Sequence, residues 1–199
     1  METDQVIEID GRAYRLIRLL GRGKGGYSWL ADCDGMAAVV KQIHHEPCRI
    51  YSFGNKIEAE QSAYARLKEI GIRIPEMLAV DAEEERIVKE YIEGPTIFEL
   101  VRDGLSAEPW LPQLREMAER AKAAEVNIDY FSPNFVVQKH TDLLYYVDYE
   151  CNEYTEEWNF DNWGIKYWSQ TPEFLKHLEY LEYRALHPKE DPSRRSRKT

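Results

Sequence analysis

A break at Glu93-Gly94-Pro95 divides this sequence into two parts with different hydrophobic periodicities. Before the break, short apolar runs alternate with the turn dipeptides Asp10-Gly11 and Asp34-Gly35, which supply the positive φ angles that tight hairpins need. After the break, the pattern is mainly helical. Because Gly and Pro interrupt regular elements, we expect a β-rich lobe over residues 1–92 and a helical lobe over residues 93–187.

The first part predicts an antiparallel meander with one helix. The helix should cover roughly Asn55–Ile70, because Ile57, Tyr64 and Leu67 recur on one face, and Gly71 should end it. The expected strands are Val6–Ile9, Tyr14–Leu20, Tyr27–Ala31, Ala37–Ile43, Met77–Val80 and Arg86–Ile92.

In the second part, Thr96 and Glu99 form the pattern of a capping box ahead of a short helix. Thr171-Pro172-Glu173 is typical of another helix start. The other expected elements are a helix from about Pro109 to Glu125, a loop over Val126–Val137, a short strand over Leu143–Asp148 and a last helix reaching Ala185.

A glycine-rich segment joins the second and third expected strands. Gly21, Gly23 and Gly26 have the spacing GxGxxG, which dinucleotide-binding folds also use, but there the glycines lead into a helix. Here they lead into a strand with a hairpin turn beyond it. In that arrangement backbone N–H groups can cover the phosphates of a nucleotide, and a flexible hairpin loop is the alternative.

A lysine and a glutamate stand where they could form an ion pair. Lys41 ends the apolar run Ala38-Val39-Val40, and Glu60 follows 19 residues later on the apolar face of the expected helix. Taken alone, a lysine at a strand end is usually a surface residue. Burying a carboxylate without a partner is costly, so we expect Glu60 to pair with Lys41, whereas Glu58 lies elsewhere on the helical wheel.

Two segments of the second part carry oxygen donors. Asn127-Ile-Asp-Tyr-Phe-Ser-Pro-Asn134 contains Asp129 and Asn134, and Asp148 follows 14 residues after Asn134 at the end of a short apolar run. A carboxylate can accept the proton of a hydroxyl, and Asn and Asp oxygens suit Mg²⁺. Taken singly, Asp129 and Asn134 also fit turn residues that bond to their own backbone.

The order and separation of these elements resemble the protein-kinase-like superfamily. "LGRGKGGYSWLA" and "AVVK" are similar to bacterial serine/threonine kinases. "EAEQSAYARLKEIGIRIPE" resembles RIO-type kinases, the small KEOPS-complex kinase and aminoglycoside phosphotransferases, and "VKEYIEGPTI" resembles the hinge. The resemblance covers residues 20–148. It implies a bilobal α+β fold, with an antiparallel sheet plus one helix in the first lobe and a reduced helical second lobe.

The resemblance also implies ATP and Mg²⁺ as cofactors, and a role for each residue. Asp129 would be the catalytic base and Lys41 would hold the α/β-phosphates, oriented by Glu60. The remaining implied roles are phosphate covering by Gly21, Gly23 and Gly26, adenine binding by the backbone of Glu90 and Ile92, and Mg²⁺ binding by Asn134 and Asp148.

Several positions depart from the superfamily pattern. Asn127 replaces the catalytic-loop histidine, Phe131 stands where many protein kinases carry a lysine, and Asp148-Tyr149-Glu150 replaces Asp-Phe-Gly. Only 51 residues follow Asp148, too few for a long activation loop and a full set of helices. We therefore expect an atypical serine/threonine protein kinase. The alternatives are a small-molecule kinase of the aminoglycoside or sugar type and a nucleotide-binding pseudokinase scaffold.

The net charge of −10 argues against general nucleic-acid binding, which needs clustered Lys and Arg. Residues 188–199 are an exception, with five basic and two acidic side chains, and should form a disordered tail that could contact RNA or an acidic partner. His44-His45 lacks metal-ligand spacing and is interpreted as a solvated loop end.

Composition also bears on compartment and partners. No apolar run approaches the ~20 residues needed to span a bilayer. The N-terminus is acidic, and the three cysteines lack CxxC spacing. These features favour a cytoplasmic protein without membrane contact. We expect a monomer or weak dimer that acts on a protein or small-molecule hydroxyl acceptor.

Overall fold

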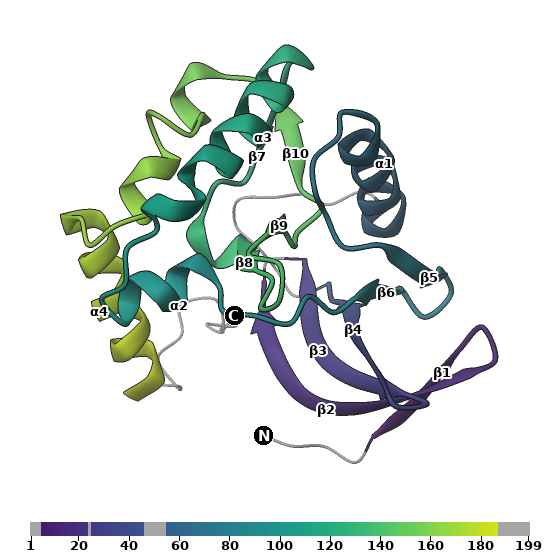
Figure 1. Ribbon diagram of the computed structural model, residues 1–199. Helices are drawn as coiled ribbons and strands as arrows, with labels where there is room; N and C mark the ends of the chain where they lie inside the picture. Colours follow the sequence, from purple (N-terminus) through teal and green to yellow (C-terminus); the bar gives the residue numbers. More distant parts are fainter. Residues whose placement is uncertain (1–4, 24, 46–54, 187–199) are drawn as a thin grey trace, which may run out of the picture. The chain divides into compact units, whose positions relative to one another are not determined.

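The computed structural model of the chain has an α+β architecture (Figure 1) and describes residues 5–23, 25–45 and 55–186. The chain divides into two compact units, Met1–Glu93 and Gly94–Thr199, a division one residue away from the predicted boundary. The predicted tail at 188–199 lies outside the described residues. Among the helices of the described ranges, none has the length and apolarity needed to cross a membrane.

The first unit is a curled six-stranded antiparallel sheet with one helix, α1 (Lys56–Glu69) (Figure 1). The strand order is β1-β2-β3-β4-β6-β5, and the two edge strands β1 and β5 contact each other, so the sheet curls. The strands are β1 (Val6–Ile9), β2 (Arg12–Arg22), β3 (Gly26–Cys33), β4 (Met36–Ile43), β5 (Met77–Asp81) and β6 (Arg86–Glu90).

The two hairpin turns predicted in this sheet are confirmed. Asp10 and Gly11 have φ angles of 51° and 71° between β1 and β2, and Asp34 and Gly35 have φ angles of 52° and 80° between β3 and β4. Two consecutive positive φ angles match the right-handed twist of the flanking strands. Asp and Gly tolerate this region better than most residues, which is why these dipeptides fix the register of the meander.

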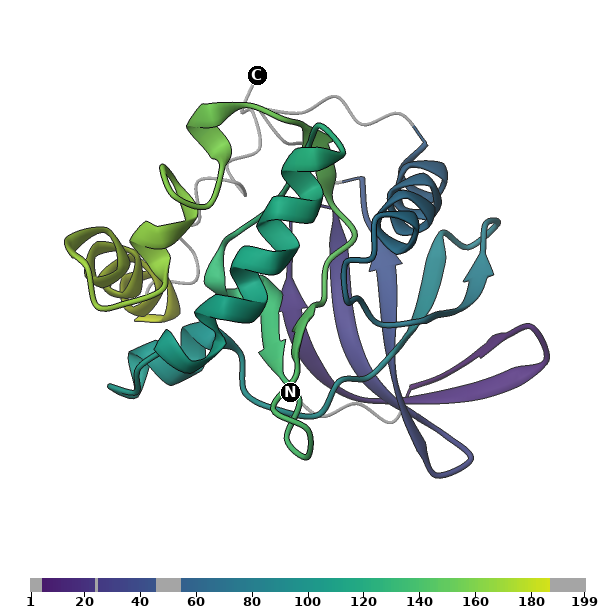
Figure 2. The same cartoon turned by 45° about the horizontal axis from the view of Figure 1, so that its top comes forward.

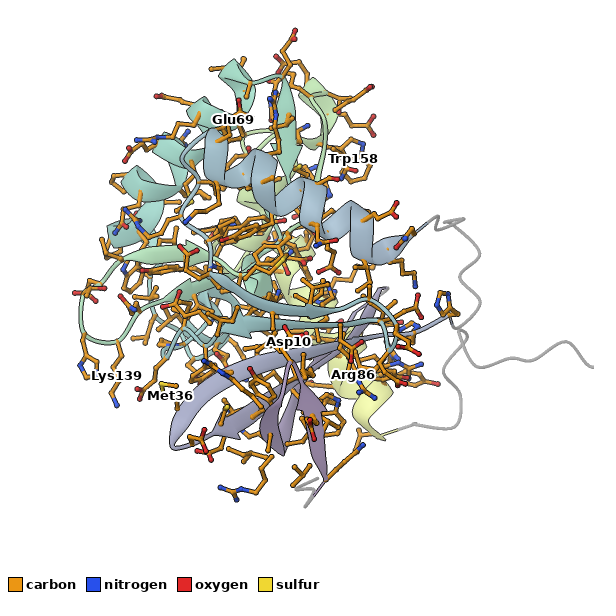
Figure 3. The ribbon with its side chains drawn as sticks, turned by 90° about the vertical axis from the view of Figure 1, so that its right-hand side faces the viewer. Asp10, Met36, Glu69, Arg86, Lys139 and Trp158 are labelled. Atoms are coloured by element: carbon orange, nitrogen blue, oxygen red, sulfur yellow. The ribbon has the colours of Figure 1, made fainter. Side chains whose placement is uncertain are left out.

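Alternation along the strands gives the sheet two different faces. Ile43 and Ile87 lie on one face, where Ile57 of α1 packs against them, so α1 covers this face. Figure 3 shows α1 crossing over the sheet, with Glu69 at its end. Lys41 is two residues from Ile43 and pairs in register with Ile87, so it lies on the face that α1 covers. The opposite face carries the cluster Ile9, Tyr14, Leu16, Ala31, Cys33, Ala38, Val40 and Val88.

Helix α1 begins and ends close to the predicted residues. The side chain of Asn55 caps its start by accepting the N–H of Glu58 at 3.2 Å. Ile70 is the C-cap, and Gly71 follows it with a φ of 76°.

The second unit is mainly helical and contains two small antiparallel sheets, β7–β10 and β8–β9. Its α-helices are α2 (Ile97–Arg102), α3 (Leu111–Ala123) and α4 (Pro172–Leu186). Its 3₁₀ helices are η1 (Glu108–Trp110), η2 (Ser132–Asn134), η3 (Glu156–Trp158) and η4 (Gly164–Tyr167). Its strands are β7 (Val126–Ile128), β8 (Phe135–Val137), β9 (Leu144–Tyr146) and β10 (Cys151–Glu153).

The helix caps predicted in this unit are confirmed, but the prediction of a loop over the whole of Val126–Val137 is wrong in part. Thr96 and Glu99 form the reciprocal capping box, and Thr171 Oγ1 accepts the N–H of Phe174 at 3.1 Å. The supposed loop contains β7 and β8 at its two ends. Their partners, β10 and β9, follow later in the chain, and strands of three residues are too short to show a period.

Aromatic side chains form a large part of the core of the second unit. Trp168 Nε1 donates to the carbonyl oxygen of Tyr130 at 2.8 Å, and a Cβ on Gly164 would lie 2.5 Å from Cβ of Tyr130. Helix α4 lies beside α2 (Figure 2), where the ring centroids of Phe98 and Phe174 are 5.2 Å apart. The other buried side chains include Leu114, Met117, Ala121, Phe135, Tyr146 and Phe160.

Candidate active site

The glycine-rich segment connects β2 to β3, as predicted. Gly21 lies in β2, Gly26 begins β3, and the N–H of Gly23 donates to the carbonyl oxygen of Gly26 at 2.9 Å. A Cβ on Gly26 would lie 2.5 Å from the carbonyl oxygen of Gln42, so glycine is required there by the packing of β3 on β4. At Gly21 and Gly23 a Cβ would meet nothing closer than 3.8 Å among the described atoms. Internal packing therefore does not explain these two glycines.

His44 and His45 follow the end of β4, as a loop end requires, and His44 also holds the glycine-rich segment. Its N–H donates to the carbonyl oxygen of Gly25 at 3.3 Å, and its ring Nε2 lies 3.2 Å from the carbonyl oxygen of Gly23. The ring also contacts Tyr27, with centroids 5.0 Å apart. Lys56, buried at the start of α1, donates to the carbonyl oxygen of His44. These contacts tie the segment to α1.

The predicted ion pair between Lys41 and Glu60 is present, joining Lys41 Nζ to Glu60 Oε1. The two side chains are only 12% and 15% exposed, so the pair is largely removed from water. It forms because Lys41 lies on the face of the sheet that α1 covers, and Glu60 lies one turn after Ile57 on the covered side. Glu58 is exposed, as expected.

Glu60 retains capacity for one more donor. Its Oε2 atom is buried and has no hydrogen-bond partner among the described residues. An unsatisfied buried carboxylate oxygen destabilises the fold, so a donor at this position would be favourable.

The end of β6 supplies the backbone groups expected to hold adenine. The N–H of Glu90 already donates to the carbonyl oxygen of Glu76 at 2.8 Å, and Glu90 Oε2 accepts the N–H of Glu76 at 3.1 Å. Of the two backbone groups of Glu90, the carbonyl is therefore the candidate for an adenine amino group. Ile92 follows, with its side chain buried. For Glu90, the expected binding of adenine by backbone groups therefore concerns its carbonyl oxygen alone.

Asp129 and Asn134 belong to one tightly bonded loop in the second unit. Asp129 follows β7, and its Oδ1 atom accepts the N–H of Phe131 at 3.1 Å. Asn134 Nδ2 donates to the carbonyl oxygen of Asp129 at 3.4 Å, which leaves its Oδ1 atom as the candidate cation ligand. These are the turn contacts expected of Asx residues, and they fix both side chains.

Asp148 is brought next to this loop by the pairing of β8 with β9. Phe135 pairs with Tyr146, and the N–H of Val147 donates to the carbonyl oxygen of Asn134 at 2.8 Å. Asp148 follows directly, and its Oδ1 atom accepts the N–H of Tyr149 at 2.9 Å. The second unit thus gathers the three predicted oxygen-bearing side chains around one small hairpin.

Burial and neighbouring charges act on these groups. Burial raises the pKa of Asp129 most, the hydrogen bond from the Phe131 N–H lowers it, and repulsion by Glu150 and Asp148 raises it further. Burial also raises the pKa of Tyr146 well above its ordinary value, helped by the charges of Asp148 and Asp129. Tyr146 therefore keeps its hydroxyl proton at neutral pH.

The donor set fits Mg²⁺ only in part. Within the described residues, no group of three or more His, Cys, Asp or Glu side chains is arranged to hold a metal ion. Asn134 and Asp148 offer one amide oxygen and one carboxylate. Mg²⁺ commonly binds one or two carboxylates and takes its other ligands from phosphates and water, so this pair suits a cation that arrives with a nucleotide.

The predicted residues therefore form two sub-sites, one within each unit. The glycine-rich segment, Lys41 and Glu60 make the first, and Asp129, Asn134 and Asp148 make the second. Their convergence around one triphosphate stays a prediction. Sequence reasoning missed His44 and Tyr146, whose hydrogen bonds go to backbone atoms.

Comparison with known proteins adds no family. Neither the models of protein families nor the curated proteins gave a match to this chain. Any functional assignment therefore depends on the residues and geometry described above.

Proposed function

We propose that this chain is an ATP- and Mg²⁺-dependent phosphotransferase with a bilobal protein-kinase-like fold, and that it acts in the cytoplasm as an atypical serine/threonine protein kinase. The observation that carries the proposal is the largely buried ion pair between Lys41 and Glu60. Replacing such a pair by apolar side chains is often neutral or stabilising, so folding alone does not require it. A lysine held in place by a carboxylate is what phosphate binding requires.

The second sub-site would supply the chemistry at the acceptor. The hydrogen bond from the Phe131 N–H holds one oxygen of Asp129 and leaves the other to accept the proton of the acceptor hydroxyl. Asn134 and Asp148 would hold Mg²⁺, which neutralises phosphate charge when bound. Lys41 would hold the α/β-phosphates, and Gly21 and Gly23 would let the backbone approach them closely.

The choice of a protein acceptor follows from the described residues after Asp148. Among them α4 is the one α-helix, and a single α-helix would do little to enclose a small substrate. A small-molecule kinase of the aminoglycoside or sugar type is the alternative, because such enzymes share the compact Asp-x₄-Asn loop. A pseudokinase scaffold is less well supported, because a scaffold does not need all five polar site residues, which are Lys41, Glu60, Asp129, Asn134 and Asp148.

The test is incubation with γ-labelled ATP and Mg²⁺, alone and with a cell extract. We expect label on this protein or on extract proteins. Label only on a small metabolite would support the alternative kinase, and absence of transfer, with nucleotide still bound, would support the scaffold.

The Asp129→Asn variant tests the role of the carboxylate. It should lose transfer by about 10²–10⁴-fold, as is typical for a general base, and keep its affinity for ATP. Asp161→Asn makes the same change at an exposed carboxylate of the second unit and should stay active. Equal turnover by the Asp129→Asn variant and the wild type would contradict the assignment.

A further inference from the structure

A side-chain hydroxyl replaces one rung of the β7–β10 ladder. The ladder ends with the pair Ile128–Cys151, so the next rung would join Asp129 to Glu150. Instead, the N–H of Asp129 donates to the Oη atom of Tyr146 at 3.2 Å, and this hydroxyl donates to the carbonyl oxygen of Glu150 at 2.8 Å. The hydroxyl thus bridges the two strands where they part.

The ring that carries this hydroxyl is fixed in the core. Tyr146 is fully buried in β9, opposite Phe135 of β8, with the ring centroids 5.2 Å apart. The ring of Phe135 also contacts Trp168, with centroids 5.0 Å apart. Because Phe135 directly follows Asn134, the position of the hydroxyl is tied to the loop that carries the candidate residues.

We propose that Tyr146 is a positioning residue that sets the separation between the loop of Asp129 and the segment of Asp148, an inference that rests on the proposed function. The hydroxyl contacts the N–H of Asp129 itself and the carbonyl two residues after Asp148. A direct rung would draw the strands to the usual ladder spacing of about 4.8 Å. A hydroxyl between the N–H and the carbonyl holds them further apart, so one side chain governs the spacing of the two carboxylates.

The Tyr146→Phe variant removes the hydroxyl and keeps the ring. In the protein without nucleotide, we expect the amide proton of Asp129 to exchange about tenfold faster, as the loss of one hydrogen bond predicts. With nucleotide, kcat should fall about tenfold or more while KM for ATP changes less than about twofold, because misplaced groups slow chemistry more than binding. Tyr154→Phe, in the same unit, should change neither quantity.

The two readouts separate this inference from the proposed function. Unchanged exchange at Asp129 would overturn the bridge whatever the activity, and faster exchange with unchanged kcat would overturn the positioning role. If the wild type transfers no phosphate, the proposed function and the positioning role fail together, while exchange still decides the bridge. If the Tyr146→Phe variant does not fold, amide exchange in the wild type tests the hydroxyl bridge by itself. Fast exchange of the Asp129 amide proton in the folded wild type would overturn the bridge.

Discussion

Single residues carry the strongest test of the first sub-site. Replacing Lys41 by Met leaves the carboxylate of Glu60 largely buried without its ammonium partner, and replacing Glu60 by Gln removes the negative charge that the ammonium of Lys41 pairs with. Both variants should therefore be less stable and less active, and the double variant should be more stable than the sum of the two changes predicts. We expect a coupling free energy of roughly 1–3 kcal/mol in a double-mutant cycle measured by urea unfolding. Additive changes would show that the two side chains do not interact in solution.

The role of Asp148 can be separated from that of its loop. The Asp148→Asn variant should weaken the Mg²⁺-dependent part of ATP binding, because an amide oxygen carries less charge than a carboxylate. The measurement is the thermal shift produced by ATP with Mg²⁺ and with EDTA. Asp142→Asn makes the same change in the turn between β8 and β9, where Asp142 is exposed, and should match the wild type. The metal assignment fails if both variants keep the full Mg²⁺-dependent shift.

At the scale of residues, the sequence predicted those contacts in which the periodicity of a helix or strand indicates that a side chain is buried. Glu60 could be assigned to Lys41 because helix periodicity places Glu60 on the apolar face of its helix, where a carboxylate needs a partner, and Lys41 ends an apolar run. Tyr146 and His44 could not be found in this way. The hydrogen bonds of Tyr146 and His44 go to backbone atoms. Every residue type has these backbone atoms, so the sequence does not indicate which residue is the partner.

At the scale of elements, α4 offers a test of pH dependence through His177. The rings of His177 and Phe131 are nearly perpendicular, with an angle of 85° between their planes and 4.9 Å between their centroids. The His177 ring also contacts the rings of Phe98, Tyr167 and Tyr180. Burial lowers the pKa of His177 below its ordinary value of 6.5. As the pH falls below that ordinary value, the unfolded chain takes up this proton first, so stability should decrease.

The measurement is urea unfolding between about pH 5 and pH 8, the range in which histidine titrates. The His177→Phe variant should lose less stability toward acid than the wild type, because other titrating groups are common to both. A second comparison, with His140→Phe at an exposed turn, should keep the wild-type slope. Identical slopes for the His177→Phe variant and the wild type would contradict the burial effect.

Elements bounded by capping residues or turn dipeptides could be predicted from the sequence, and very short strands could not. The caps at Asn55, Thr96 and Thr171 and the two Asp-Gly turns mark their elements locally, so their ends could be predicted to within a few residues. The strands β7 and β10 depend instead on a partner about 25 residues away. With three residues each, they have no period of their own, and only tertiary pairing creates them.

At the scale of the whole chain, the change of periodicity at Glu93-Gly94-Pro95 predicted the division into two units. Gly94 has structural grounds to be glycine, since its Cβ would lie 1.8 Å from the carbonyl oxygen of Val137 within the second unit. The α+β class followed from the same change of pattern. The predicted convergence of the two sub-sites is of another kind, because no local pattern in the sequence encodes contacts between distant residues.

The curl of the six-stranded sheet bears on how the protein behaves when crowded with copies of itself. An open sheet offers unpaired N–H and C=O groups along its outer strands, and these groups can recruit strands from other molecules. Here β1 and β5 contact each other within the molecule. Where they meet, this contact should hinder the addition of a strand from another chain and so restrain the stacking of chains into fibrils.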